Sequence, residues 1–198
     1  APDGKEWQLT VYDKDYKTPD WIKGGIMYQI FPDRFHKGKG NIKNVPEDRI
    51  IHENTTDTPV WKPNEEGKIL NNDYYGGNLK GIEEKLPYIA SLGVNVIYLN
   101  PIFEAHSNHR YNTADYSKID SLLGDEKDFK SLCQKADEYG IKILLDGVFS
   151  HTGSDSIYFN REGRYNSIGA FNSTESPYKD WFTFEDNGKY KSWWGIDT

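Results

Sequence analysis

Asp146 and His151 are the residues whose types and spacing point most directly to chemistry in this sequence. Asp146 directly follows the apolar run 141–145, and His151 comes five residues later. A carboxylate at the end of a buried strand is costly to desolvate unless its charge is used. The same carboxylate could instead cap a turn by accepting backbone N–H groups, and His151 alone is typical of a loop histidine. The spacing leaves the functional and the capping interpretations open.

Polar and aromatic clusters also follow two other apolar runs. Residues 32–34 follow the run 26–31, and residues 100–111 follow the run 94–99. The second cluster contains Asn100, Phe103, His106, Asn108, His109, Arg110 and Tyr111. In parallel α/β folds, ligands bind where the strands end, at the carboxyl edge of the sheet. We therefore expect three strand ends to build one site.

Metal and phosphate chemistry find little support in the sequence. His106 and His109 have His-x-x-His spacing and Asp115 follows, but a zinc site needs a further ligand at a matching spacing. The run 37–40 lacks the full phosphate-loop pattern with its terminal Lys-Ser/Thr. The sequence also contains no Gly-x-Ser-x-Gly nucleophile motif. We expect no metal site among these residues.

Alternating strand and helix patterns would position these clusters. Apolar residues at helical spacing over 79–93 indicate a helix, with a kink at Pro87 and a C-terminal cap at Gly93. A second helix is expected from about Asp125 to Gly140. The expected strands are 26–31, 94–99 and 141–146. This alternation implies right-handed parallel crossovers, and the apolar second and third strands indicate a sheet covered on both faces.

The remaining regions are less regular. Residues 36–74 are polar and predict a long loop of the kind that is usually functional. The alternating run 7–12 predicts a single strand, and residues 152–198 are polar and aromatic without clear periodicity. The 198 residues fall short of the ~250 that a complete eight-stranded α/β barrel typically needs.

Composition excludes several classes of protein. The chain has 31 acidic and 24 basic residues, a net charge of −7, and no basic stripe, which argues against a nucleic-acid partner. No apolar stretch reaches the ~18 residues of a membrane span. The single cysteine, Cys133, excludes a disulfide framework and fits a reducing compartment, so a cytoplasmic protein is expected over a secreted one. Aromatic residues form 15% of the chain, which fits either an ordinary Tyr-rich interior or a surface that stacks on sugar rings.

Five segments carry a further pattern when they are taken together. They are residues 25–35 (GIMYQIFPDRF), 74–82 (YYGGNLKGI), 92–103 (LGVNVIYLNPIF), 108–116 (NHRYNTADY) and 146–151 (DGVFSH). In this order they resemble the α-amylase family of glycoside hydrolases (family 13). The resemblance is greatest to its neopullulanase, cyclomaltodextrinase and maltogenic-amylase branch. One such match would carry little weight, but five in family order carry much more.

The resemblance implies an α/β protein that contains part of a (β/α)8 TIM barrel. Residues 1–20 would be the end of an N-terminal β-sandwich, and residues 21–152 the first three βα units of the barrel. Residues 153–198 would begin the domain that the family inserts after the third strand. Relative to its family, the chain is then expected to be cut at both ends.

The resemblance also implies roles for four residues. Asp146 and His151 match positions that hydrogen-bond the sugar at the cleavage subsite, Tyr111 matches the aromatic that stacks on that sugar, and His109 lies beside it. Family members cleave α-1,4 and in some cases α-1,6 bonds of α-glucans such as starch, maltodextrin, pullulan or cyclodextrin, with retention of configuration. Retention needs a nucleophile and an acid/base about 5–5.5 Å apart. In the family these follow the fourth and fifth strands, so they are expected beyond Thr198, and the 198 residues alone are expected to be inactive.

Calcium is the one cofactor that the family resemblance suggests, and the matching site is degraded. Lys37 and Lys39 stand in the loop that supplies ligands in relatives, and Asn78 replaces an Asp. Calcium prefers several oxygen ligands, with carboxylates adding charge. We expect a calcium site that is weak or lost.

Two other functions stay open at this point. A non-catalytic amylase-like protein would bind a glucan or a protein partner and would lack the catalytic carboxylates. An independent small α/β binding domain would unfold cooperatively by itself. Retention of Asp146, His151 and Tyr111 favours an enzyme that acts on α-glucans. A Gly-x-Arg-x-Asp segment ending a fourth strand, with a Glu after a fifth, would support the enzyme.

Overall fold

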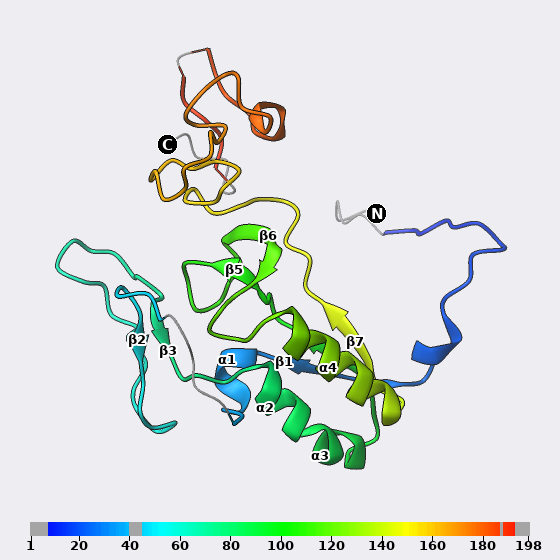
Figure 1. Cartoon of the computed structure of the whole chain (residues 1–198). Coiled ribbons are helices and arrows are strands. Elements are labelled where there is room, and N and C mark those ends of the chain that lie inside the picture. The colour runs from blue at the N-terminus through cyan, green and yellow to red at the C-terminus, as the bar shows by residue number, and fades with distance from the viewer. Residues whose placement is uncertain (1–7, 40–44, 187, 193–198) are drawn as a thin grey trace, which may run out of the picture.

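The centre of the molecule is a three-stranded parallel sheet with the order β1-β4-β7 (Figure 1). The computed structural model describes residues 8–39, 45–186 and 188–192. The strands are β1 (Ile26–Ile30), β4 (Val94–Leu99) and β7 (Lys142–Leu145), which confirms all three strands predicted from apolar runs. Because the pairing is parallel throughout, the carboxyl ends of the three strands lie at one edge.

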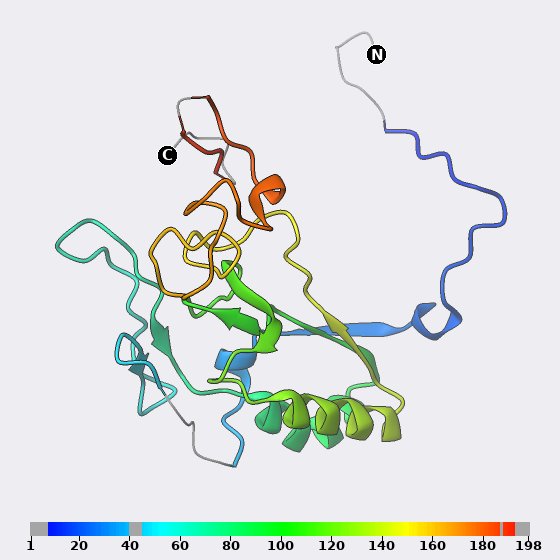
Figure 2. The same cartoon turned by 45° about the horizontal axis from the view of Figure 1, so that its top comes forward.

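The pairing of the strands shows which side chains share a face of the sheet. One cross-strand row is Tyr28, Ile97 and Ile143, and the next is Ile30, Leu99 and Leu145. Both rows belong to the apolar core or pack against it. The helices that cover this face are α2 (Leu79–Glu84), α3 (Leu86–Ser91) and α4 (Glu126–Glu138). Figure 2 shows them along one side of the sheet.

The opposite face of the sheet is open over the described part of the chain. Met27 is 46% exposed and Leu144 is 40% exposed. The prediction that both faces are covered is therefore wrong for the third predicted strand, β7, whereas in β4 the Val96 side chain on this same face is fully buried. The reason is the handedness of the crossovers, because the helices after β1 and after β4 return on the same side of the sheet.

Local signals set the helix ends, although the one helix predicted over 79–93 with a kink at Pro87 is divided into α2 and α3. The first helix breaks at Lys85, and Pro87 lies in the first turn of α3, where its missing N–H leaves no hydrogen bond unmade. Gly93 (φ 75°) and Gly140 (φ 68°) follow α3 and α4 in the left-handed region that favours glycine. Within the described ranges, no helix is long and apolar enough to cross a membrane.

The structure adds two strand pairs that the sequence patterns do not predict. β5 (Phe103–Ala105) and β6 (Thr113–Ile119) form an antiparallel hairpin in the polar stretch after β4. β2 (Ile50–Ile51) and β3 (Asp73–Tyr74) pair in parallel within the long loop 36–74. The remaining short elements are α1 (Pro32–Phe35) and two 3-10 turns, η1 (Asp20–Ile22) and η2 (Lys179–Trp181).

The strand predicted over residues 7–12 is wrong for the part that the structure describes. Residues 8–12 form no strand, and Leu9 and Val11 are 85% and 86% exposed. Trp7 lies outside the described residues. The physical reason is that no other described segment pairs with this run, and a strand without a partner is not stable in water.

The segment 153–192 is irregular and aromatic, as predicted. The ring of Phe159 lies 4.8 Å from that of Phe182 and 4.7 Å from that of Tyr190, between centroids. Tyr158 stacks on Trp181 with centroids 5.2 Å apart. Figure 1 places this segment beyond the β5–β6 hairpin. Small aromatic clusters thus hold it together in place of regular secondary structure.

Candidate functional site

The carboxyl edge of the sheet fixes the backbone of Asn100 and Asp146. The parallel ladder continues one residue past the strands: Asn100 N donates to Ile30 O (2.9 Å), and Asp146 N donates to Leu99 O (3.1 Å). Side chains alternate along a strand, and Leu99 faces the helices. Asn100 and Asp146 therefore leave the sheet on its open face.

A chain of side-chain hydrogen bonds runs along this edge to Asp146. Gln29 Nε2 donates to Asn100 Oδ1 (2.9 Å), and Asn100 Nδ2 donates to the Tyr111 hydroxyl (3.2 Å). The hydroxyls of Tyr98 and Tyr111 both lie within reach of a hydrogen bond to the Asp146 carboxylate. The bond to Asp146 is the largest cause that raises the pKa of Tyr98 to about 12, whereas burial, followed by the Asp146 charge, raises the pKa of Tyr111. The structure thus brings two of the predicted site residues, Asp146 and Tyr111, together.

His109 lies beside Tyr111, as the sequence predicts. The two rings stack with centroids 5.9 Å apart and planes 29° apart. The Tyr111 backbone N–H donates to His109 Nδ1 (3.1 Å), so the ring hydrogen of the neutral imidazole is on Nε2. Burial first, and the Arg110 charge second, lower the pKa of His109. At neutral pH His109 is therefore a neutral donor next to the aromatic face of Tyr111.

Arg110 anchors the loop that carries these two rings. Its side chain is fully buried and binds the Asp120 carboxylate twice, through Nε (3.1 Å) and Nη2 (3.3 Å). Its backbone has φ 60°, a left-handed conformation that a non-glycine residue keeps only where contacts hold it. With Arg110 buried, the neighbouring Tyr111 remains 36% exposed at the sheet edge.

His151 occupies the loop that follows Asp146. Its Nδ1 lies 3.0 Å from Ser150 Oγ, and its carbonyl oxygen accepts from the Tyr116 hydroxyl (3.0 Å). The Tyr116 hydroxyl also contacts the carbonyl oxygen of Val148. Tyr116 of strand β6 therefore holds this loop in place.

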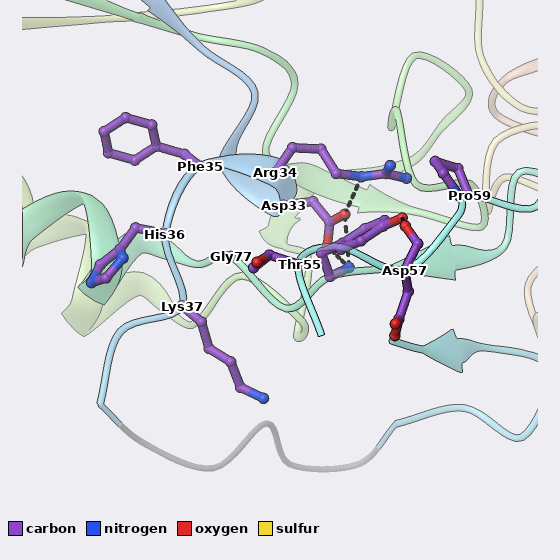
Figure 3. A pocket seen from close by; sticks show the side chains of 10 residues that line it. Asp33, Arg34, Phe35, His36, Lys37, Thr55, Asp57, Pro59 and Gly77 are labelled. Carbon is purple, nitrogen blue, oxygen red and sulfur yellow. Dashed lines mark hydrogen bonds and ion pairs between the residues drawn. The ribbon is translucent and has the colours of Figure 1, made fainter. Parts of the chain in front are cut away.

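A cavity of about 330 Å³ lies beside α1, apart from these residues (Figure 3). Its lining residues are Asp33, Arg34, Phe35, His36, Lys37, Thr55, Asp57, Pro59, Tyr75 and Gly77. The buried Asp33 carboxylate accepts from Arg34 Nε (2.7 Å) and from the backbone N–H groups of Tyr75 (3.1 Å) and Gly76 (3.2 Å). Its charge is thus used inside the protein, to hold the segment that follows the loop 36–74 against α1. None of the four predicted site residues lines this cavity.

The groups at the expected calcium position do not form a ligand set. Asn78 Oδ1 accepts from Gly81 N (2.8 Å) and Gly38 N (3.2 Å), so it caps α2 and ties the loop after α1 to that helix. Lys37 lies beside the neighbouring cavity, and its side chain carries an ammonium group, which repels a cation. Across the part of the chain that the structure describes, no group of three or more His, Cys, Asp or Glu side chains could hold a metal ion. Among the described residues of this position, the Asn78 side-chain oxygen is therefore already used by two backbone N–H groups.

Sequence reasoning missed the supporting residues Gln29 and Tyr98, and it named Asn100 only as part of a cluster. A usable signal was present: Tyr98 and Asn100 are two residues apart, as are Leu144 and Asp146. Period-two spacing places such pairs on one face of a sheet. The positions of Tyr98, Asn100 and Asp146 therefore indicated which face of the sheet carries the polar side chains.

A parallel sheet with helices on one face and polar side chains at its carboxyl edge is the arrangement found in part of a βα-barrel. The chain belongs to the α-amylase family, since the α-amylase catalytic-domain model matches residues 29–194. Its fold is accordingly part of a (β/α)8 barrel.

Several known proteins are similar to this chain. An amylopullulanase of Thermoanaerobacterium thermosulfurigenes is 50% identical over an alignment that covers 98% of this chain and 11% of that protein. An intracellular maltogenic amylase of Bacillus subtilis is 39% identical, covering 87% and 26%. The solved structure of a cyclic α-maltosyl-(1→6)-maltose hydrolase from Arthrobacter globiformis, in complex with maltose, is 32% identical with a TM-score of 0.71, covering 90% and 37%. The chain spans between 11% and 26% of the length of these two curated relatives.

Proposed function

We propose that this chain is part of a retaining glycoside hydrolase that acts on α-glucans. Asp146, Tyr111, His109 and His151 bind the sugar at the cleavage subsite of that enzyme. The observation that carries the proposal is the hydrogen-bonded chain from Gln29 through Asn100 to Tyr111 at the carboxyl edge, where Asp146 is also held and His109 stacks on Tyr111. The names of similar proteins, which include amylopullulanase and maltogenic amylase, support α-glucan as the substrate class.

The proposal extends to the organisation of the chain. Residues 21–152 form the first three βα units of the catalytic barrel, residues 1–20 end an N-terminal β-sandwich, and residues 153–198 begin an inserted domain. The change from regular βα alternation to irregular, aromatic structure after residue 152 supports the last boundary.

The four site residues position the substrate, and the bond-breaking groups lie elsewhere in the complete protein. Asp146 accepts hydrogen bonds from sugar hydroxyls, and the exposed ring of Tyr111 stacks on the apolar face of the sugar. His109 Nε2 donates to a further sugar oxygen. Retaining hydrolysis also needs a carboxylate nucleophile and a carboxylic acid about 5–5.5 Å apart. We propose that residues following later strands of the barrel supply that pair.

The test of this proposal is the hydrolysis of pullulan and maltodextrin by the complete protein and by its Asp146→Ala variant. We expect the variant to lose about 100-fold or more in kcat/KM, because a sugar held less well misses the reacting geometry. Its thermal midpoint should change little, because Asp146 lies half-buried at the edge of the sheet. Asp137→Ala on the exposed side of α4 is the matched control and should keep normal activity. Near-normal turnover in Asp146→Ala would remove Asp146 from the site.

We also propose that calcium is not required at the loop after α1. The hydrogen bond from Gly38 N to Asn78 Oδ1 joins the loop to α2 without a metal ion. Close packing also joins them, since a Cβ on Gly38 would lie 2.3 Å from Gly81 N. Adding EDTA to the complete protein and then restoring calcium should leave the thermal midpoint and the activity unchanged. A fall in the midpoint with EDTA that is reversed by calcium, and absent in a variant with Asn78→Ala, would contradict this proposal.

A further inference from the structure

Four polar side chains leave the open face of the sheet near its carboxyl edge. Gln29 and Tyr98 are register partners in β1 and β4, and Tyr98 stands opposite Leu144 in β7. Asn100 and Asp146 follow Tyr98 and Leu144 by two residues each. Because side chains alternate along a strand, Gln29, Tyr98, Asn100 and Asp146 all emerge on the same face. They come from three strands whose backbones are hydrogen-bonded to one another.

The hydrogen bonds among these residues have one consistent direction. A side-chain amide offers an NH2 donor and an oxygen acceptor, whereas an ionised carboxylate only accepts. Gln29 donates to Asn100, and Asn100 donates to the hydroxyl oxygen of Tyr111. The hydroxyl hydrogen of Tyr111 is then available for Asp146. The chain of donors therefore ends at Asp146.

Both groups that hold Asp146 in this network are neutral hydroxyls, from Tyr98 and Tyr111. Neutral donors orient a carboxylate without cancelling its charge. A carboxylate has about four lone-pair sites, so about two remain for other donors after the two tyrosine bonds. Sugar hydroxyls are donors of this kind, and a carboxylate fixed in one orientation offers them those sites without an ordering cost.

We propose that Tyr98 and Asn100 are positioning residues for sugar binding, Tyr98 by orienting the Asp146 carboxylate and Asn100 by orienting the Tyr111 ring through its hydroxyl. This inference rests on the proposed function, because it explains how the same subsite is held. Support comes from the pKa of Tyr98, which is raised to about 12 with the hydrogen bond to Asp146 as its largest cause.

The first experiment compares kcat and KM for maltodextrin in the complete protein and in Tyr98→Phe. The substitution removes one hydroxyl and keeps the ring, so the thermal midpoint should not change. A hydrogen bond to a charged group is strong enough that its loss should lower kcat/KM about 10-fold or more. Tyr28→Phe, the same change in β1 on the helix-covered face, is the matched control and should keep wild-type kcat/KM.

A double variant separates positioning from a merely structural role. If Tyr98 acts through Asp146, its hydroxyl has little left to do once the carboxylate is replaced. Tyr98→Phe combined with Asp146→Asn should then have about the kcat/KM of Asp146→Asn alone. If Asp146→Asn has no measurable turnover, the same comparison uses calorimetric dissociation constants for maltotriose. Effects that multiply would show that Tyr98 acts independently and would overturn its role.

Asn100→Ala and Tyr111→Phe form the corresponding pair for the other arm of the network. We expect each to lower kcat/KM and the double variant to be no worse than the more affected single variant. A complete protein that is inactive on every α-glucan would overturn the proposed function itself. An active protein in which Tyr98→Phe and Asn100→Ala both keep wild-type kcat/KM would overturn only the positioning role.

Discussion

Glu83 is the charged residue whose burial matters most for the stability of the helix layer. Its side chain is 4% exposed, and its Oε1 lies 2.7 Å from Lys80 Nζ and 3.1 Å from Lys135 Nζ. Burial by itself would raise the pKa of Glu83, but hydrogen bonds from Lys80, Ser131 and Lys135 outweigh it and lower the pKa to about 2. The carboxylate therefore links α2 to α4 while it stays ionised.

Replacement of Glu83 by Gln should lower stability in a pH-dependent way. Because the pKa is lower in the folded state, the stabilisation is present above the unfolded value of 4.5 and is lost as pH falls toward 2. The shift corresponds to about 3 kcal/mol, which screening around the half-exposed lysine ends reduces to about 2 kcal/mol. Unfolding midpoints of the wild type and Glu83→Gln should differ most above pH 5, and the difference should shrink steadily below pH 4.5 and become small near pH 2. A difference that is constant with pH would contradict this role for the charge.

At the scale of elements, α4 owes its starting point to a reciprocal cap. Asp125 Oδ1 accepts from Lys127 N (2.8 Å) and Asp128 N (3.0 Å), and Asp125 N donates to Asp128 Oδ2 (3.1 Å). These bonds satisfy backbone donors that the helix itself leaves unpaired. The same cap ends the loop that follows the β5–β6 hairpin.

Asp125→Ala should therefore destabilise the fold by about 1 kcal/mol, the usual cost of losing an N-cap. The measurement is chemical denaturation followed by circular dichroism. Asp137→Ala, near the other end of α4 with an exposed ion pair to Lys142, serves as the control and should cost less than about 0.5 kcal/mol. Equal losses in the two variants would show that the cap does not set the start of α4.

The elements that sequence reasoning predicted are those with strong local signals. Apolar periodicity and the glycines after α3 and α4 were sufficient for the helices and the three parallel strands. The β5–β6 hairpin was missed because Thr113, Ala114 and Asp115 of β6 are all buried, so the strand shows no alternation. Burial on both sides of a polar strand comes from tertiary contacts, which a local pattern does not contain.

The residues of the candidate site were likewise predictable where a local signal or the family resemblance pointed to them. Position after an apolar run singled out Asp146, and the family resemblance added Tyr111, His109 and His151. The contacts of Gln29 and Tyr98 depend on strand register. The partner of Gln29 is Asn100, 71 residues away, and the partner of Tyr98 is Asp146, which follows a different strand. Register across parallel strands is a property of the assembled sheet.

At the scale of the whole molecule, the 198 residues build a sheet with one covered face and one open face. The covered face holds the apolar core from Ile30 to Ile141. On the open face, Met27 is 46% and Leu144 40% exposed, and Phe149 beyond the edge is 82% exposed. Apolar side chains exposed together in this way mark a surface that another part of a protein covers.

The 198-residue chain by itself should therefore unfold broadly on heating. A layer of helices on one face of three strands forms a small core, and the irregular segment 153–192 is held mainly by its own aromatic contacts. Calorimetry should give a van't Hoff enthalpy well below the calorimetric one, and the dye ANS should bind the exposed apolar face. The complete protein, in which further barrel strands would cover that face, should bind little ANS. A sharp two-state transition of the 198 residues without ANS binding would instead favour an independent domain, and the open face would then need a function other than barrel closure.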